Sequence, residues 1–185
     1  MRTLIVLCLC LAAGFTGAEP IAMTKVQKFV TNENGIVKIS GVDHGVVSIG
    51  TELNISRPAK IKMRMRRTAV SAVNPGHFGV ELFGGDDYRA HCYTHDGASF
   101  IASLHQGKMK ISDNGVRGTK EIFPAQAAAS WVDLELYVQP KLAEIHVAGN
   151  PRGMVSANLL PLKKFSVYGY QNDVEVKDLS WEPLP

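Results

Sequence analysis

The segment Lys60-Ile61-Lys62-Met63-Arg64-Met65-Arg66 decides the fold class, because apolar and cationic side chains alternate in it without a break. Successive side chains of an extended strand point to opposite faces, so Ile61, Met63 and Met65 share one face and the cations share the other. The segment therefore predicts a β-strand that buries its apolar face and shows its charged face to water.

Weaker alternation recurs at residues 131–138, 143–147 and 174–181. Between the apolar runs stand residues that favour turns: Asn34-Gly35, Asn74-Pro75-Gly76, Gly84-Gly85-Asp86-Asp87, Asp96-Gly97, Asp113-Asn114-Gly115, Gly149-Asn150-Pro151 and Gln171-Asn172-Asp173. They recur about every 10 to 20 residues, a spacing typical of antiparallel strands joined by hairpins. Because one sheet cannot bury its own apolar face, we expect an all-β fold of two antiparallel sheets packed as a β-sandwich.

The first 18 residues have the order of a secretory signal peptide. One positive residue, Arg2, precedes an apolar run at residues 4–13, and mostly small residues follow at 14–18. The apolar run is shorter than the roughly 20 residues that span a bilayer. We therefore expect cleavage after Ala18 and a secreted, extracellular product rather than a membrane-inserted one.

Charge and cysteine content exclude several classes of protein. The formal net charge of +3 falls to +2 on cleavage, because Arg2 is the one charged residue among the first 18. This balance predicts neither nucleic-acid binding nor membrane binding. Of the three cysteines, Cys8 and Cys10 leave with the signal peptide, so Cys92 has no intrachain partner. The 167 residues that remain of 185 suit one domain held by packing alone.

The order of segments from residue 40 to residue 181 resembles the galectin family. Residues 50–55 look like the family's early strand, written G-x-x-L-x-I/V. Residues 131–138 and 145–149 are similar to its F-x-L-x-I strand and to the V-x-x-N-G hairpin that follows it. Residues 165–176 look like its closing segment, L-x-I-x-G-D-V-x-L.

This resemblance implies a concanavalin-like jelly roll, a two-sheet antiparallel β-sandwich that binds β-galactosides. It divides the chain into a signal peptide at residues 1–18, an N-terminal extension at 19–39 and a galectin-like domain at 40–185. It also implies that the protein recognises glycans and is not an enzyme, and we expect no cofactor.

The galectin motifs for galactose are H-x-N-P-R, V-x-N and W-G-x-E, and this chain departs from each of them. In the first motif Tyr93 replaces the Asn, and in the second Ser103 replaces the Asn. In the third Arg117 replaces the Trp, and the acidic residue comes one position late. The resemblance thus implies a degenerate carbohydrate-binding set: His91, Tyr93, His95, Ser103, Arg117 and Glu121.

These replacements predict weak or no binding to lactose-type sugars. Each lost hydrogen bond costs about 1 kcal/mol, and the lost aromatic stack costs about as much again. Two hypotheses remain open. The first is a secreted galectin-like carbohydrate-binding protein with a degenerate site, and the second is a secreted interaction or structural protein that has lost sugar binding.

The cations of residues 60–67, with Arg57, have two interpretations. Every second charge along a strand lies about 7 Å from the next, a spacing that can follow a sulfated or sialylated glycan. The alternative is a solvated outer face that keeps the strand soluble.

Three further patterns bear on chemistry. His91 and His95 would lie about 13 Å apart along a strand, too far for one ion, so we expect no metal site. Asp133 and Glu135 share a strand face as a glycosidase pair can, but we favour a solvated face. The sequon at Asn54 (Asn-Ile-Ser) predicts N-glycosylation.

Overall fold

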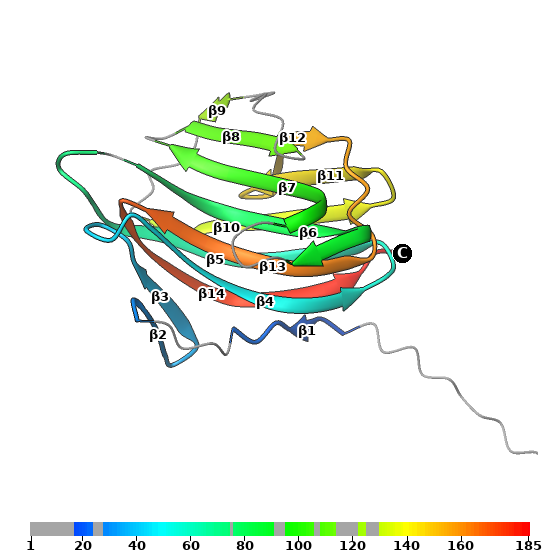
Figure 1. Cartoon of the computed structure of the whole chain (residues 1–185), viewed down its shortest axis with the longest axis horizontal. Helices are drawn as coiled ribbons and strands as arrows, with labels where there is room; N and C mark the ends of the chain where they lie inside the picture. Colours follow the sequence, from blue (N-terminus) through cyan, green and yellow to red (C-terminus); the bar gives the residue numbers. More distant parts are fainter. Residues whose placement is uncertain are drawn as a thin grey trace, which may run out of the picture.

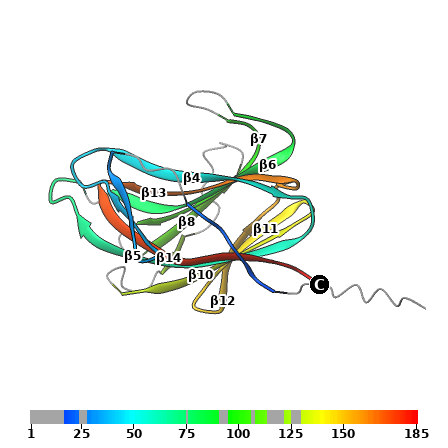
Figure 2. The same cartoon turned by 90° about the horizontal axis from the view of Figure 1, so that it is seen from below.

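The computed structural model shows two β-sheets that lie one over the other (Figures 1 and 2). The structure describes residues 17–23, 28–74, 76–90, 95–105, 108–113, 122–124 and 130–185. Within these ranges, it describes the backbone but not the side chains of residues 87–90, 95–100, 103–105, 108–113 and 122–124.

The first sheet, sheet A, has eight strands within the described residues. They are β1 (Glu19–Pro20), β2 (Val30–Glu33), β3 (Ile36–Ser40), β5 (Ala59–Val70), β10 (Val132–Gln139), β11 (Leu142–Val147), β12 (Asn150–Val155) and β14 (Asn172–Pro183). Their order across the sheet is β12-β11-β10-β5-β14-β3-β2, and β1 also pairs with β14.

The second sheet, sheet B, has six strands within the same part of the chain. They are β4 (Val46–Ile55), β6 (His77–Ala90), β7 (His95–His105), β8 (Lys108–Asp113), β9 (Ile122–Pro124) and β13 (Leu162–Tyr170). Their order is β4-β13-β6-β7-β8-β9, and the paired strands are antiparallel. The prediction of an all-β, two-sheet antiparallel sandwich is confirmed.

The strict alternation of β5 directs its apolar residues into the core, as predicted. Ile61, Met63 and Met65 are at most 2% exposed. They belong to one core cluster with Phe78 of β6 and Phe165 of β13, so the core lies between the two sheets. Each such side chain contributes about 1.5–3 kcal/mol by its removal from water.

Two of the predicted turns are tight hairpin turns. Asn34 and Gly35 join β2 to β3 with φ angles of 53° and 78°. Ala148 and Gly149, one residue before the predicted start of the next turn, join β11 to β12 with φ angles of 50° and 76°. Two successive positive φ angles match the right-handed twist of the strands that such a turn connects.

Two other predicted turns are wrong, because the residues lie inside strands. Gly84 and Gly85 are part of β6, at the start of a register shift against β7. A Cβ at Gly84 would collide with the carbonyl oxygens of Leu159 and Pro161, and the Gly85 N–H donates to those oxygens over 3.2 and 3.1 Å. Glycine therefore serves close approach of two backbones here, not a change of direction.

Asp96-Gly97 likewise lies within β7, and β6 is connected to β7 between Ala90 and His95. In Figure 2 the paired ends of these two strands rise away from the rest of the sandwich.

Residues 19–39, predicted as an N-terminal extension, instead contribute β1, β2 and most of β3 to sheet A. Ile21 and Met23 are 8% and 5% exposed and belong to the core cluster. Most of the predicted signal peptide, residues 1–16, lies outside the described residues. Within the described part of the chain, no helix has the length and apolar character that crossing a membrane requires.

Candidate functional site

Two side chains of β13 are buried on the side of sheet B that faces away from sheet A. Strand alternation turns Phe165 and Val167 into the core, so Ser166 and Tyr168 lie on the opposite, outer face. Ser166 is nevertheless 3% exposed and Tyr168 5% exposed. These two side chains are thus shielded from water although they are not part of the core cluster.

The strand register brings further groups beside these two residues. Tyr168 lies opposite Gly79 of β6 and Ser48 of β4, while Ser166 lies opposite Glu81 of β6. Three hydroxyl groups and one carboxyl group therefore share adjacent rows on the outer face. We call Ser166, Tyr168, Glu81 and their aromatic neighbours described below the outer-face cluster.

Glu81 is the titratable group at the centre of this cluster. Burial raises the pKa of its carboxyl group, and the Lys164 ammonium opposes that shift without cancelling it. The glycine at position 50 also has a role, because a Cβ there would lie 2.7 Å from Ser166 Oγ and 2.9 Å from Lys164 Cε. A carboxyl group held away from bulk water makes strong hydrogen bonds to any hydroxyl group that reaches it.

Aromatic rings stand at both ends of the cluster. The His77 ring meets Tyr168 edge-on, with centroids 5.6 Å apart, and tilts against Tyr170 at 5.2 Å. At the other end the Lys164 ammonium lies 5.8 Å from the centroid of the Phe83 ring. Rings combined with a few hydrogen-bonding groups are typical of sites that bind sugars or other polar ring compounds.

The structure describes the backbone of two predicted site residues. Ser103 of β7 is the register partner of Gly79, which is in turn the partner of Tyr168. His95 is paired with Ala90 at the far end of the same strand, about 26 Å away along β7. The structure does not bring these two residues into one subsite. The other four lie outside the described residues: His91, Tyr93, Arg117 and Glu121.

Sequence reasoning missed the residues that form the cluster: His77, Glu81, Phe83, Ser166, Tyr168 and Tyr170. The signal was present as period-2 alternation in residues 165–170, where Ser166, Tyr168 and Tyr170 follow the two-residue spacing of one strand face. Comparison with family motifs drew attention to residues 91–121 instead.

On the outer face of sheet A, four of the cations considered as an anion-binding stripe have acidic neighbours. Lys60 Nζ and Lys62 Nζ lie 2.7 and 2.9 Å from Glu182 Oε1. The hydrogen bonds that both lysines donate lower the pKa of the Glu182 carboxyl group, and the bond that Lys60 donates to Glu182 raises the pKa of Lys60.

Two arginines of the stripe also have acidic neighbours. Arg64 Nε lies 2.9 Å from Asp133 Oδ1, and Arg66 Nη2 lies 2.6 Å from Glu175 Oε2. The Arg66 guanidinium also lies 4.6 Å from the centroid of the Trp131 ring. These partners favour the solvated, charge-balanced interpretation of the stripe over a free site for anionic polymers.

The carboxylates considered as a glycosidase pair are occupied by neighbours on that same face. Asp133 has its ion pair with Arg64, and Glu135 accepts a hydrogen bond of 3.1 Å from the Tyr137 hydroxyl. Asn54, the predicted glycosylation site, is exposed on β4, an edge strand of sheet B. An exposed asparagine on an edge strand is accessible to modification, and N-glycosylation of Asn54 stays a prediction.

No protein-family model and no curated protein sequence matches this chain. Among solved structures, carbohydrate binding module CBM66 from Bacillus subtilis is similar with a TM-score of 0.61 at 8% identity, over 83% of this chain and 90% of that one. The metal-free Emp46p carbohydrate recognition domain has a TM-score of 0.61 at 12% identity, over 84% and 86% of the two chains. A lichenase derived from a mouse hindgut metagenome has a TM-score of 0.58 at 10% identity, over 84% of each chain.

These similarities establish a lectin-like jelly-roll fold that is not specific to galectins. Carbohydrate-binding modules and carbohydrate-cleaving enzymes share the same architecture at this level of identity. The fold alone therefore does not distinguish a carbohydrate-binding protein from an enzyme, and only the residues of the site can do so.

Proposed function

We propose that this protein is a secreted, non-enzymatic carbohydrate-binding protein whose glycan lies on the outer face of sheet B. The observation that carries the proposal is the burial of Tyr168 and Ser166 on the face opposite the core, beside the shielded carboxyl group of Glu81. Hydroxyl and carboxyl groups can bond sugar hydroxyls in fixed directions, while aromatic rings contact the apolar side of a sugar ring.

The printed names of two structural neighbours support a glycan as the ligand. CBM66 is named a carbohydrate binding module, and the Emp46p domain is named a carbohydrate recognition domain. In this proposal the protein is a divergent relative of galectins, and the replaced motifs make simple lactose a poor ligand. Ser103, in register with Gly79, belongs to the same binding face.

We propose binding without catalysis because Asp133 and Glu135, the acidic pair considered from the sequence, are engaged by Arg64 and by the Tyr137 hydroxyl.

An anionic glycan, sialylated or sulfated, would find a positive charge on the proposed binding face at Lys164, the register partner of Phe83. We also propose that Asn54 carries an N-linked glycan, because its exposed position on edge strand β4 is open to the transferase.

A glycan array with neutral, sialylated and sulfated glycans tests the proposal, using the secreted chain from residue 19 onward. We expect a defined set of glycans to bind the wild type and to be lost in Glu81→Gln, which keeps the shape of the side chain. The matched control is Glu135→Gln on the outer face of sheet A, where glycan binding should be unchanged. Folded wild-type protein that binds no glycan would instead favour an interaction protein that has lost sugar binding.

A further inference from the structure

Strand β14 carries a bulge where it pairs with β5. Lys177 lies opposite Arg64 of β5 and Ser180 lies opposite Lys62, so two residues of β14 face one residue of β5. Asp178 takes up the extra length with a φ angle of 55°. Aspartate tolerates this left-handed conformation better than most residues do.

Two different strands pair with β14 on the two sides of this bulge. Strand β3 pairs with residues 173–176, and β1 pairs with Ser180 and Trp181 along the same edge. The Ile21 N–H adds one more bond, to the carbonyl oxygen of Leu179 over 3.1 Å. Along this side of β14, the partner strands β3 and β1 thus leave a gap between them beside the bulge.

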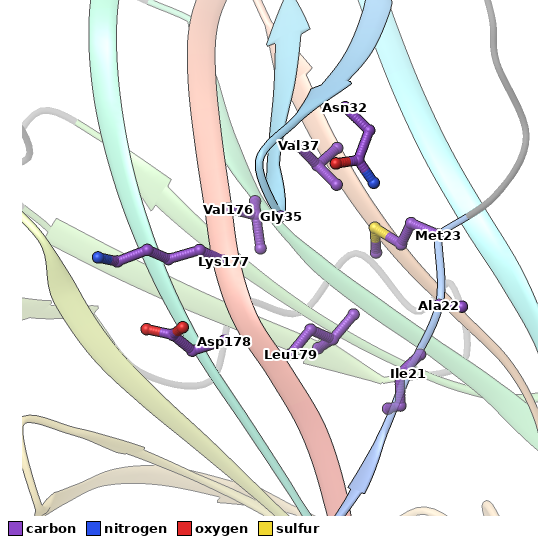
Figure 3. Close-up of a pocket in the computed structure, with 10 residues that line it drawn as sticks. All are labelled: Ile21, Ala22, Met23, Asn32, Gly35, Val37, Val176, Lys177, Asp178 and Leu179. Atoms are coloured by element: carbon purple, nitrogen blue, oxygen red, sulfur yellow. The ribbon is translucent and has the colours of Figure 1, made fainter.

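A cavity of about 300 Å³ opens at this gap (Figure 3). Its walls include four core residues, Ile21, Met23, Val37 and Val176, which are at most 8% exposed. Leu179, which packs against the core, completes the apolar lining. The gap therefore gives access from the edge of sheet A to the hydrophobic core.

We propose that this cavity binds a small, uncharged, mostly apolar molecule with one hydrogen-bonding group. Figure 3 shows the side chains of Lys177 and Asp178 directed away from the cavity, although both residues line it. The Lys177 ammonium lies 4.5 Å from the centroid of the Trp131 ring, on the outer face of the sheet. The charged side chains that line the cavity are therefore not aimed at a ligand inside it, so an ion would lose its hydration without gaining a partner.

The hydrogen-bonding group of the ligand would meet Asn32. Figure 3 shows the Asn32 amide directed toward Met23 at one end of the cavity. An amide offers both a donor and an acceptor, so an alcohol, ketone or amide fits this end. Met23 is flexible and polarizable, which lets the apolar wall adapt to the ligand.

The size of the cavity limits the ligand further. Ligand pockets usually measure about 300–1,000 Å³, so this cavity takes a molecule of about ten non-hydrogen atoms. Left empty, an apolar cavity deprives its lining atoms of packing contacts, and an occupant would restore them. This site lies at the edge of sheet A, whereas the proposed glycan face is on sheet B, so the two can be tested separately.

The test uses fluorine NMR of 4-fluorobenzyl alcohol added to the chain from residue 19 onward. This probe is neutral, is mostly apolar and carries one hydroxyl group. We expect a saturable change in the fluorine signal. The charged analogue 4-fluorobenzoate should bind about tenfold more weakly, because its carboxylate would be desolvated without a partner.

Two variants and one control assign the signal to the cavity. Val37→Phe fills the cavity from its wall, and Asn32→Phe fills one end of it from a position that is exposed and so safe for folding. Both should weaken binding of the alcohol about tenfold by removing its space. Ala72→Leu, at an exposed alanine outside the cavity, should leave binding unchanged.

Binding that does not saturate, that survives in Asn32→Phe, or that is equal for the alcohol and the benzoate would overturn the proposal. Glycan-array signals should be the same in Asn32→Phe and the wild type. The failure of one proposal therefore leaves the other standing.

Discussion

Ser166 of β13 and Glu81 of β6 are register partners on neighbouring strands, on the face of sheet B that points away from the core. Their pairing puts a hydroxyl group next to a carboxyl group in a region shielded from water. Such a pair is costly to bury and contributes nothing to the apolar core, which is why we assign it to ligand binding.

The shielded carboxyl group should make stability depend on pH. Burial raises the pKa of Glu81, so folding favours the protonated carboxyl group over the charged one. The charged form lowers the stability of the fold, and this loss appears as the pH rises from the ordinary pKa of 4.5 through the raised pKa. Glu81→Gln removes this loss. Calorimetry should find the melting temperature of the variant, relative to wild type, higher at pH 7 than at pH 4. An equal difference at both pH values would contradict the assignment.

The hydroxyl group of Tyr168 should contribute directly to glycan affinity. Tyr168→Phe keeps the ring and removes one hydrogen bond, which costs about 1 kcal/mol or about fivefold in affinity. Titration calorimetry with the best array glycan measures the change. Tyr137→Phe, whose hydroxyl bonds Glu135 on the outer face of sheet A, is the matched control and should bind as the wild type does.

The buried Met63 of β5 should contribute much more to the free energy of unfolding than the exposed Met154 of β12 does. Met63 is 2% exposed, so Met63→Ala should lower the free energy of unfolding by about 2–5 kcal/mol. Met154 is 58% exposed on β12, so Met154→Ala should change it by less than about 0.5 kcal/mol. Urea unfolding followed by circular dichroism compares the two, and similar losses would refute the assignment of the buried face.

The ion pairs of Lys60 and Lys62 with Glu182 should give a small stabilisation that is lost in acid. The hydrogen bonds from these lysines lower the pKa of Glu182. The stabilisation is therefore present at pH values above the ordinary pKa and is lost as the pH falls through the lowered pKa. Glu182→Gln should cost less than about 1 kcal/mol at pH 7. Urea unfolding at pH 7 and pH 3 should find the cost smaller at the lower pH and in high salt.

The sequence was a good guide where a local pattern determines local structure. The alternation of β5 is strict because one face is buried and the other is wet, and the Asn34-Gly35 turn has a backbone that few other residues adopt. The prediction of a turn at Gly84-Gly85 was wrong, because glycine occurs both in turns and where two backbones approach closely. Only the position of the distant Leu159 and Pro161 distinguishes the two uses.

The candidate site was harder to predict because its residues come together only through register. Glu81 and Ser166 lie 85 positions apart in the chain, and nothing near either residue indicates the other. A motif comparison finds residues that are close in sequence. The sheet face selects every second residue from strands whose neighbours are set by the topology.

The pairing of β1 with β14 has a consequence for how the chain is made. Glu19 and Trp181 are register partners 162 positions apart, so the first leaves the ribosome long before the second. A chain that crosses a membrane from its N-terminus would arrive with this edge of sheet A still open. Ile21 and Met23 could not reach their buried positions until β14 had followed, and until then those apolar side chains would be exposed to chaperones.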